Sequence, residues 1–324
     1  MQTSRVPRPL FHDRVSPRHD DAAAELARTL GANPASIAPK HFYDPLGSAL
    51  FTAICELPEY YPTRTETAIF VRHLDEIAAR IGPGATLIDL GAGDCAKAAR
   101  LFDALAPVQY VAVDIATAFV AQALERLQRE RPEIAMIGVG VDFTAEMWLP
   151  DTVRAGRRVF FYPGSSIGNF GPAEAAAFLR RVREHTDPDG GLLIGVDLAK
   201  PASIVEPAYD DALGVTAAFN LNVLNRVNRL LGADFAIADW RHVAFLERTH
   251  GRIEMHLEAR RAVEVRWPGG ERHFAAGERI HTENSYKYER EAFDAVLRDA
   301  GFAPRASWTD PAGWFAVVHA VPAG

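Results

Sequence analysis

The segment ATLIDLGAGD (residues 85–94) decides the fold, because an apolar run passes directly into a glycine-rich loop. A short apolar run that ends at glycines is typical of a buried strand, and helix-forming residues follow from Cys95. Asp114 ends the next predicted strand (108–116), 21 residues beyond Gly93. Glycines let the backbone approach a ligand closely, and a carboxylate at a strand end accepts hydrogen bonds from ribose hydroxyls. The segment therefore predicts a turn that binds a nucleoside-bearing cofactor.

Two cofactor classes fit this turn. A dinucleotide site wants G-x-G-x-x-G, and the third position here is Ala96, an allowed variant. The form D-x-G-x-G after an apolar strand is instead typical of S-adenosylmethionine methyltransferases. VDF (141–143) follows the third predicted strand, where Asp142 would accept from an adenine amino group and Phe143 would flank the ring. The sequence favours S-adenosylmethionine and leaves an NAD(P) oxidoreductase open.

Strands and helices alternate between Thr65 and Lys200, which predicts an α/β fold with a parallel sheet and helices on both faces. The predicted strands, some with the loop that follows, are 85–93, 108–116, 134–143, 157–170 and 190–199, with a closing strand at 314–321.

The pattern changes after Lys200. Residues 207–235 look helical, and residues 252–288 alternate with period two around a Pro-Gly-Gly turn. We therefore predict a discontinuous parent domain with an inserted α+β lobe. The predicted ranges are 1–19 for an N-terminal tail, 20–60 and 200–286 for the lobe, and 61–199 with 287–324 for the cofactor domain.

Composition limits the partners. The chain has 324 residues and a net charge of -7, which argues against nucleic acid or an anionic membrane surface as a partner. Two cysteines are too few for a disulfide framework or a thiolate zinc site, and no clustered metal-ligand motif occurs. No stretch of eighteen apolar residues predicts a membrane span. We expect a cytoplasmic protein without a secretion signal, a metal or an obligate protein partner, consistent with a monomer.

Five segments carry a family resemblance. They are YDPLGSALFTAICELPEYYPTRTE (43–66), YPGSSIGNF (162–170), AYDDALGVTAAFNLNVLNRVNRLLGADF (208–235), IEMH (253–256) and HTENSYKY (281–288). Together they resemble the histidine-specific S-adenosylmethionine methyltransferases of ergothioneine biosynthesis, over nearly the whole chain after residue 40. The resemblance implies a Rossmann-like class I methyltransferase domain with a separate amino-acid-binding lobe. It also implies an enzyme that adds three methyl groups to the α-amine of L-histidine, giving the betaine hercynine.

The resemblance also implies the site residues. Tyr60 and Tyr209 would bind the substrate carboxylate, and Glu283 with Ser285 would bind the imidazole, whose pocket Met255 and Thr216 would shape. Tyr43 would lie close to the amine and Asn169 would contact the amino-acid head, which makes these two the catalytic candidates. On the cofactor side the implied residues are Gly91, Lys97, Asp114, Asp142 and Phe143. Asp94 departs from the small or hydroxyl residue expected beside the glycines.

Physical chemistry supports these roles independently. Phenols suit the carboxylate, because each donates a hydrogen bond without placing a cation near the sulfonium. Residues 283 and 285 would share one face of a strand, where Glu283 could accept from a ring N–H. Pro58 and Pro62 restrict the loop around Tyr60 and so reduce the cost of ordering it. The rings of Tyr43, Phe51 and Tyr60 could tolerate a trimethylammonium group by cation–π contact.

Neighbouring polar residues receive other interpretations. Tyr61 is expected to pack at the lobe boundary, and Arg64 and Glu66 to form the polar start of a helix. The four asparagines at 220, 222, 225 and 228 receive no site role. Two functional alternatives stay open: methylation of an indole amino acid, against which Glu283 and Met255 argue, and an inactive ligand-sensing module.

Overall fold

The computed structural model describes residues 8–15 and 19–324. These residues fall into two compact units. Unit 1 comprises 8–15, Pro62–Leu198 and Tyr288–Gly324, and unit 2 comprises 19–61 and Ala199–Lys287. The sequence predicts domain boundaries after residues 60, 199 and 286. The structure divides the chain after residues 61, 198 and 287, so each boundary differs by one residue.

The segment 1–19, predicted as an N-terminal tail, contains a strand and the start of a helix where the structure describes it. β1 (Leu10–Asp13) pairs in parallel with β5 (Ala135–Gly140), and α1 (His19–Gly31) begins at His19. A glycine on β5 makes room for β1, since a Cβ on Gly138 would lie 2.3 Å from the Phe11 ring. Residues 1–7 and 16–18, which the same prediction covers, lie outside the described residues.

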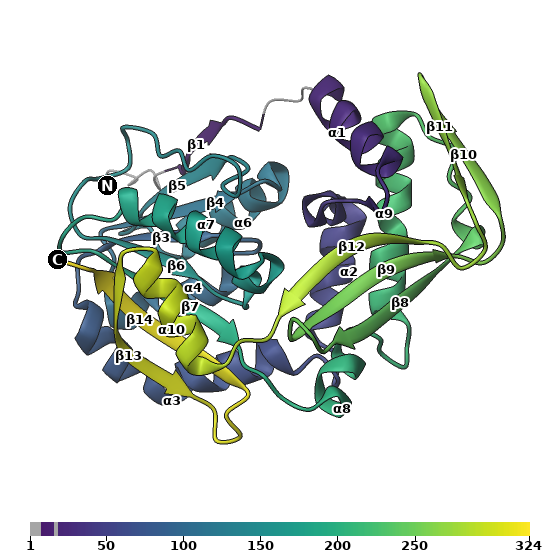
Figure 1. The fold of residues 1–324 in the computed structure, drawn as a ribbon. Helices are drawn as coiled ribbons and strands as arrows, with labels where there is room; N and C mark the ends of the chain where they lie inside the picture. The colour runs from purple at the N-terminus through teal and green to yellow at the C-terminus, as the bar shows by residue number, and fades with distance from the viewer. Residues whose placement is uncertain (1–7, 16–18) are drawn as a thin grey trace. The chain divides into compact units, whose positions relative to one another are not determined.

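The described residues of unit 1 form one eight-stranded sheet (Figure 1). The strand order in this sheet is β1-β5-β4-β3-β6-β7-β14-β13. The strands not yet bounded are β3 (Thr86–Leu90), β4 (Gln109–Asp114), β6 (Arg158–Tyr162), β7 (Gly191–Asp197), β13 (Phe302–Thr309) and β14 (Phe315–Pro322). β1 and β3 to β7 run parallel to one another. β14 runs in the opposite direction and pairs antiparallel with both β7 and β13. The predicted α/β fold with a central parallel sheet is confirmed, and so are its five strands and the closing strand β14.

Helices cover both faces of this sheet (Figure 1). They are α3 (Tyr61–Ile81), α4 (Ala96–Ala99), α5 (Phe102–Leu105), α6 (Thr117–Glu130), α7 (Pro172–Glu184) and α10 (Arg290–Asp299). Side chains of α3, α5 and α6 share one buried core with β3 and β4, while α7 and α10 pack against each other on the other side. The helix-forming residues that follow from Cys95 make two short helices, α4 and α5, separated by Arg100 and Leu101.

Unit 2 is a separate α+β assembly (Figure 1). Its helices beyond α1 are η1 (Pro39–Phe42), α2 (Pro45–Cys55), α8 (Ala202–Val205), η3 (Glu206–Ala208), α9 (Val215–Leu231) and η4 (Ile237–Asp239). Its strands are β2 (Ala35–Ser36), β8 (Trp240–Glu247), β9 (Arg252–Ala259), β10 (Val263–Trp267), β11 (Gly270–Phe274) and β12 (Arg279–Tyr286). β2-β12-β9-β8 form a sheet, β10 and β11 form a hairpin, and α9 packs against α2, β8 and β9.

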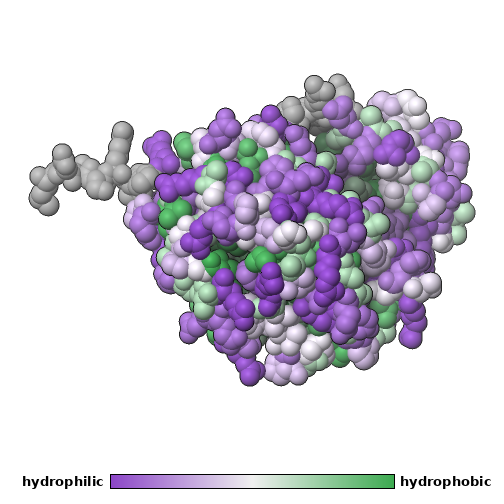
Figure 2. All heavy atoms as spheres, turned by 60° about the vertical axis from the view of Figure 1, so that its left-hand side comes forward, coloured by the Kyte–Doolittle hydropathy of each residue, from purple (hydrophilic) through white to green (hydrophobic). Residues whose placement is uncertain are grey.

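On the face drawn in Figure 2, hydrophilic residues dominate and hydrophobic ones form small separate patches. Leu213 and Val71 are the most exposed large apolar side chains of the described residues. Within the same part of the chain, no helix has both the length and the apolar character that a membrane span requires.

Candidate active site

The glycine loop after β3 adopts the backbone that its sequence predicts. Gly91 and Gly93 have φ values of +73° and +53°, a region that favours glycine. A Cβ at Gly91 would lie 3.8 Å from the Phe143 ring, and one at Gly93 would meet no atom of the described residues within 4 Å. The loop therefore borders open space beside Phe143, which is where a ligand can approach the backbone.

Asp114 fixes this loop from the end of β4. Its Oδ2 accepts from Gly93 N at 2.9 Å, and its Oδ1 accepts from Ala116 N at 2.8 Å. Burial raises the pKa of Asp114, and these backbone N–H groups oppose that shift. The structure thus brings Gly91, Asp114 and Phe143 to one edge of the sheet, as the sequence predicts.

Asp142 and Phe143 follow β5 at the same edge. Asp142 Oδ1 accepts from Thr144 N at 3.2 Å, so the carboxylate forms a turn within its own loop. The Phe143 ring meets the Tyr162 ring edge to face, with centroids 6.0 Å apart. Both residues are half-buried, so each retains surface that a ligand could contact.

Asp89 is a buried acid that sequence reasoning did not select. It lies in β3, and its Oδ2 accepts from Tyr110 Oη at 2.8 Å. Its Oδ1 has no hydrogen-bond partner among the described residues. Burial raises the pKa of Asp89 to about 7. The sequence contained a signal for this residue, because an acid inside the apolar run LIDL is expected to be buried. Burial of a carboxylate is unfavourable unless the group has hydrogen-bond partners.

Lys97, a predicted cofactor contact, pairs with Glu66. Lys97 Nζ donates to Glu66 Oε2 at 2.7 Å, and Gly164 N donates to Glu66 Oε1 at 2.7 Å. The Glu66 side chain is 1% exposed, so its interpretation as the polar start of a helix is wrong. A Cβ at Gly195 would lie 2.2 Å from Glu66 Oε1, which explains the glycine in β7. Glu66 thus connects α3, α4 and the loop that follows β6.

Asn169 ends the short helix η2 (Ser166–Asn169) in that loop. Ser165, at φ +58°, precedes the helix and its Oγ accepts from Asp197 N at 2.8 Å. Asn169 is half-buried and follows β6, at the carboxyl edge of the parallel strands. The sheet therefore places this catalytic candidate on the same edge as the glycine loop.

Unit 2 gathers the predicted aromatic residues. The rings of Tyr43 and Phe51 are 5.8 Å apart, those of Phe51 and Tyr60 6.2 Å, and those of Tyr60 and Tyr209 6.3 Å. Burial and the neighbouring Tyr209 raise the pKa of Tyr60 well above its usual value. Tyr60 is therefore a neutral phenol near neutral pH and is able to donate a hydrogen bond.

The two adjacent tyrosines have different surroundings. Tyr60 is half-buried beside Tyr209, whereas Tyr61 is buried and begins α3. Lys200 Nζ donates to Tyr61 Oη at 3.0 Å, which connects the segment where the chain leaves unit 2 with the segment where it enters unit 2 again. The expected packing role of Tyr61 agrees with this contact.

The carboxyl-terminal half of β12 forms a polar row. Lys287 Nζ donates to Tyr209 Oη at 2.8 Å and to Ser285 Oγ at 2.7 Å. Tyr209 Oη and Ser285 Oγ also lie within 2.7 Å of each other. Glu283 and Ser285 share one face of β12, and Lys287, which directly follows the strand, reaches Ser285 on that face. The sequence did not lead us to predict Lys287 as a site residue. Its position two residues after Ser285 in HTENSYKY was the available signal, because side chains two positions apart on an extended chain point to the same side.

Glu283 pairs across the sheet with Met255 of β9, which is 2% exposed. Burial raises the pKa of Glu283 to about 7, and the positive charge of Lys287 opposes that rise. Thr216 lies buried in the first turn of α9, where its N–H donates to Asp211 Oδ1 at 2.7 Å. The predicted imidazole residues therefore come from β9, β12 and α9, which pack together within unit 2.

Buried polar residues outside the predicted set position these side chains. The His242 ring Nδ1 accepts from Asn220 Nδ2 at 2.8 Å, so its Nε2–H donates to the backbone oxygen of Tyr209 at 2.8 Å. Asp44 Oδ1 accepts from Gly47 N at 2.8 Å and from Asn222 Nδ2 at 2.9 Å, which fixes the chain beside Tyr43. The α9 asparagines, which received no site role, thus hold unit 2 together internally.

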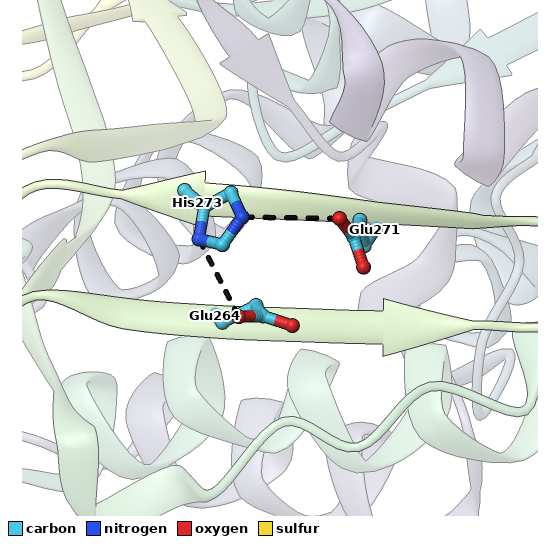
Figure 3. A group of neighbouring side chains, drawn as sticks. All are labelled: Glu264, Glu271 and His273. Atoms are coloured by element: carbon cyan, nitrogen blue, oxygen red, sulfur yellow. Dashed lines mark ion pairs between the residues drawn. The ribbon is translucent and has the colours of Figure 1, made fainter.

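Two other surface features lie apart from these residues. Among the described residues, Glu264, Glu271 and His273 of the β10–β11 hairpin place three possible metal-ligand atoms within 4.8 Å of one another (Figure 3). All three side chains are exposed, and Arg266 forms ion pairs with both glutamates, so we assign no metal to them. A hollow of about 660 Å³, lined by parts of α3 and of the edge strand β13, does not lie at the carboxyl ends of the parallel strands.

Comparisons with known proteins agree with this arrangement. A family model described as histidine-specific methyltransferase, SAM-dependent, matches residues 22–322. Histidine N-alpha-methyltransferase of Mycolicibacterium smegmatis is 42% identical over 312 residues, which cover 93% of this chain and 96% of that protein. The protein of the same name from Mycobacterium tuberculosis is 40% identical, over 88% of this chain and 90% of its own length. Ergothioneine biosynthesis protein 1 of Neurospora crassa is 31% identical over 82% of this chain and 31% of its own length.

Proposed function

Because the chain belongs to the family of histidine-specific, S-adenosylmethionine-dependent methyltransferases, we propose that it adds three methyl groups to the α-amine of L-histidine. The product is hercynine, which serves ergothioneine biosynthesis. Two relatives named for this activity, at 42% and 40% identity over most of the chain, support the proposal. The observation that carries it is the row of Glu283, Ser285 and Lys287 against Tyr209 in unit 2.

We assign amino-acid binding to unit 2. A bound amino acid must find a partner for each polar group that it buries. Tyr60 is a neutral phenol beside Tyr209, and we propose that both hydroxyl groups donate to the substrate carboxylate. Glu283 accepts from an imidazole N–H and Ser285 supplies a second polar contact, while Met255 and Thr216 shape the pocket. An indole offers a single ring N–H, so it would gain less from this pair of polar groups.

We assign cofactor binding to the carboxyl edge of the unit 1 sheet. The open space at Gly93, the carboxylate of Asp114 and the Phe143 ring fit a nucleoside. Each Asp114 oxygen accepts one backbone N–H, which leaves lone pairs for ribose hydroxyls. Asp142 would accept from the adenine amino group, and Lys97 and Gly91 complete the set. S-adenosylmethionine, when bound, would supply the methyl group on its sulfonium, with S-adenosylhomocysteine as the leaving group.

The residues around the amine have a positioning task. The amine must be neutral with its lone pair free, so correct placement contributes most of the rate enhancement. We propose that Tyr43 and Asn169 orient the nitrogen and that its proton leaves to water. The rings of Tyr43, Phe51 and Tyr60 would stabilise the accumulating ammonium charge by cation–π contact.

The decisive experiment incubates the purified chain with S-adenosylmethionine and each of the twenty amino acids in turn. Mass spectrometry would detect one, two and three added methyl groups on histidine alone. A methylated tryptophan instead would support the indole alternative. Absence of any product, with S-adenosylhomocysteine still binding in calorimetry, would indicate a ligand-sensing module and overturn the proposal.

We also propose that the enzyme acts in the cytoplasm as a monomer. All the residues assigned to the two ligands come from one chain, so the reaction requires no second copy. Light scattering of the active protein should give a mass near the chain mass of 35.5 kDa. A larger mass would contradict the monomer.

A further inference from the structure

Lys287 is a buried cation to which the proposed function assigns no contact with the substrate or the cofactor. Its side chain is almost fully enclosed at the end of β12, where the residue is 7% exposed. Its Nζ lies within hydrogen-bond distance of both Tyr209 Oη and Ser285 Oγ, and 4.7 Å from the centroid of the Tyr209 ring. Since Tyr209 Oη and Ser285 Oγ also touch, the three polar atoms form a triangle.

The hydrogens of this triangle can be counted. An ammonium group carries only donors, so both hydroxyl oxygens must accept from Lys287. The contact between Tyr209 and Ser285 uses the hydrogen of one hydroxyl group. The ammonium group therefore restricts the directions in which the two hydroxyl groups can donate. Without the ammonium, each hydroxyl group could turn toward the other or toward water.

Charge complements this arrangement. Glu283 lies in β12 and Lys287 directly follows that strand, so a half-buried anion and a buried cation flank Ser285 along the chain. The cation favours the ionised carboxylate, which is the form that accepts from an imidazole N–H. Lys287 thereby influences Tyr209, which is assigned to the substrate carboxylate, and both Glu283 and Ser285, which are assigned to the imidazole.

We propose that Lys287 is a positioning residue for histidine, because it orients the hydroxyl groups of Tyr209 and Ser285 and balances the charge of Glu283. The inference rests on the proposed function and adds a residue to it. Lys287 acts through its neighbours, so its loss affects recognition of histidine more than the chemical step. Cofactor binding, assigned to unit 1, is independent of it.

The test compares Lys287→Met with the wild-type enzyme. We expect the KM for histidine to rise about 10- to 100-fold, the scale of a lost charged hydrogen bond, with kcat changed less than about threefold. S-adenosylhomocysteine should bind Lys287→Met with unchanged affinity, which also verifies that the variant folds. Lys200→Met is the matched control, because Lys200 likewise donates to a tyrosine hydroxyl group, that of Tyr61, which has no assigned contact with the substrate. Its KM should stay within about twofold of wild type.

A second comparison separates positioning from packing. In Ser285→Ala, the Lys287→Met change should cost much less than in the wild-type background, because the oriented hydroxyl is already gone. Equal costs in both backgrounds would mean that Lys287 does not act through Ser285 and would overturn the inference. If Lys287→Met does not fold, Lys287→Gln replaces it. The Gln amide both donates and accepts, so it too should raise KM, and an unchanged KM would refute the proposal.

Failure of the inference and failure of the proposed function give different results. A wild-type enzyme that methylates histidine, with a Lys287→Met variant of equal KM, removes only the role of Lys287. A wild-type protein that neither binds nor methylates histidine removes the function on which the inference rests.

Discussion

At the scale of single residues, Glu283 is an acid whose ionised form is unfavourable in the free protein. Its surroundings raise its pKa from 4.5 to about 7, so the ionised carboxylate is held at a cost in the free protein. Lys287 offsets part of that cost. An imidazole N–H would supply the remaining hydrogen bond, which means that the site is less stable empty than when histidine fills it.

Glu283→Gln should change the pH dependence of stability. The folded pKa lies above the unfolded one, so between about pH 4.5 and pH 7 the folded state holds a proton that the unfolded state has released. The free energy of unfolding therefore falls as pH rises through this window, by about 3 kcal/mol. The variant should lose this fall, and urea unfolding of the free protein at about pH 5 and about pH 8 measures the difference.

Asp89 provides the internal check. Burial also raises its pKa to about 7, so it contributes a fall of the same sign that should persist in Glu283→Gln. The variant should also bind histidine at least about tenfold more weakly, because its neutral amide accepts a weaker hydrogen bond. A variant whose stability falls with pH as steeply as that of the wild type would contradict the assigned burial of Glu283.

Glu66→Gln should destabilise unit 1. The substitution keeps an oxygen that accepts from Gly164 N but removes the charge that pairs with Lys97. Because Lys97 is one-third exposed and can reach water, we expect a loss of only about 1–2 kcal/mol. Thermal unfolding would measure it. Arg100→Gln is the control, since it removes an exposed bond to Thr67 and should cost less than about 0.5 kcal/mol.

At the scale of elements, the sequence predicted what short-range patterns determine. The run LIDLGAG specified β3 and its turn, and the alternation in HTENSYKY placed residues 283 and 285 on one face of a strand. β13 was missed because Pro304 interrupts an edge strand with weak alternation. β1 was missed because its four residues gain their order only from pairing with β5, more than 120 residues later.

The start of α2 is an element whose geometry depends on one glycine. A Cβ on Gly47 would lie 1.7 Å from the backbone oxygen of Phe42, immediately before Tyr43. Gly47→Ala should therefore displace Tyr43 and lower the free energy of unfolding by about 1–3 kcal/mol. The KM for histidine should rise as well, and both quantities are accessible by chemical unfolding and steady-state kinetics.

Gly31→Ala is the matched control in the same unit. A Cβ there would meet no atom of the described residues within 4 Å, and the backbone is not left-handed. Alanine at this position should be neutral or stabilise the protein by up to about 1 kcal/mol, because it restricts the unfolded chain. Equal losses in the two variants would show that the close approach at Gly47 has no structural consequence.

At the scale of the molecule, the discontinuous organisation was predictable because the strand-helix rhythm stops after Lys200 and returns near residue 288. The contacts that complete the candidate site were not. Tyr209 and Lys287 are 78 positions apart, and Glu66 and Gly164 are 98 apart. No local pattern encodes such pairs. Resemblance to a family supplied the roles of residues such as Tyr60, whereas the contacts that Lys287 and Glu66 make emerged only from the folded structure.

Because the cofactor is assigned to unit 1 and the amino acid to unit 2, we predict that each ligand slows hydrogen exchange in a different set of residues. S-adenosylhomocysteine alone should slow amide exchange in residues 91–97, 114–117 and 142–146 of unit 1. L-Histidine alone should slow it in residues 43–60, 209–216 and 281–287 of unit 2. A ligand at about 100 times its Kd lowers the population of open states about 100-fold, so the slowing should be readily measurable by mass spectrometry.

The β10–β11 hairpin serves as the reference for both ligands, because its cluster of Glu264, Glu271 and His273 belongs to neither set of assigned residues. Residues 163–170 are left out of the comparison, since Asn169 is predicted to contact the amino acid although it lies in unit 1. Protection of β12 by S-adenosylhomocysteine alone, or of the glycine loop by histidine alone, would show that the ligands are assigned to the wrong units. Protection that respects the boundaries at residues 61, 198 and 287 would mean that each unit recognises its ligand with its own side chains.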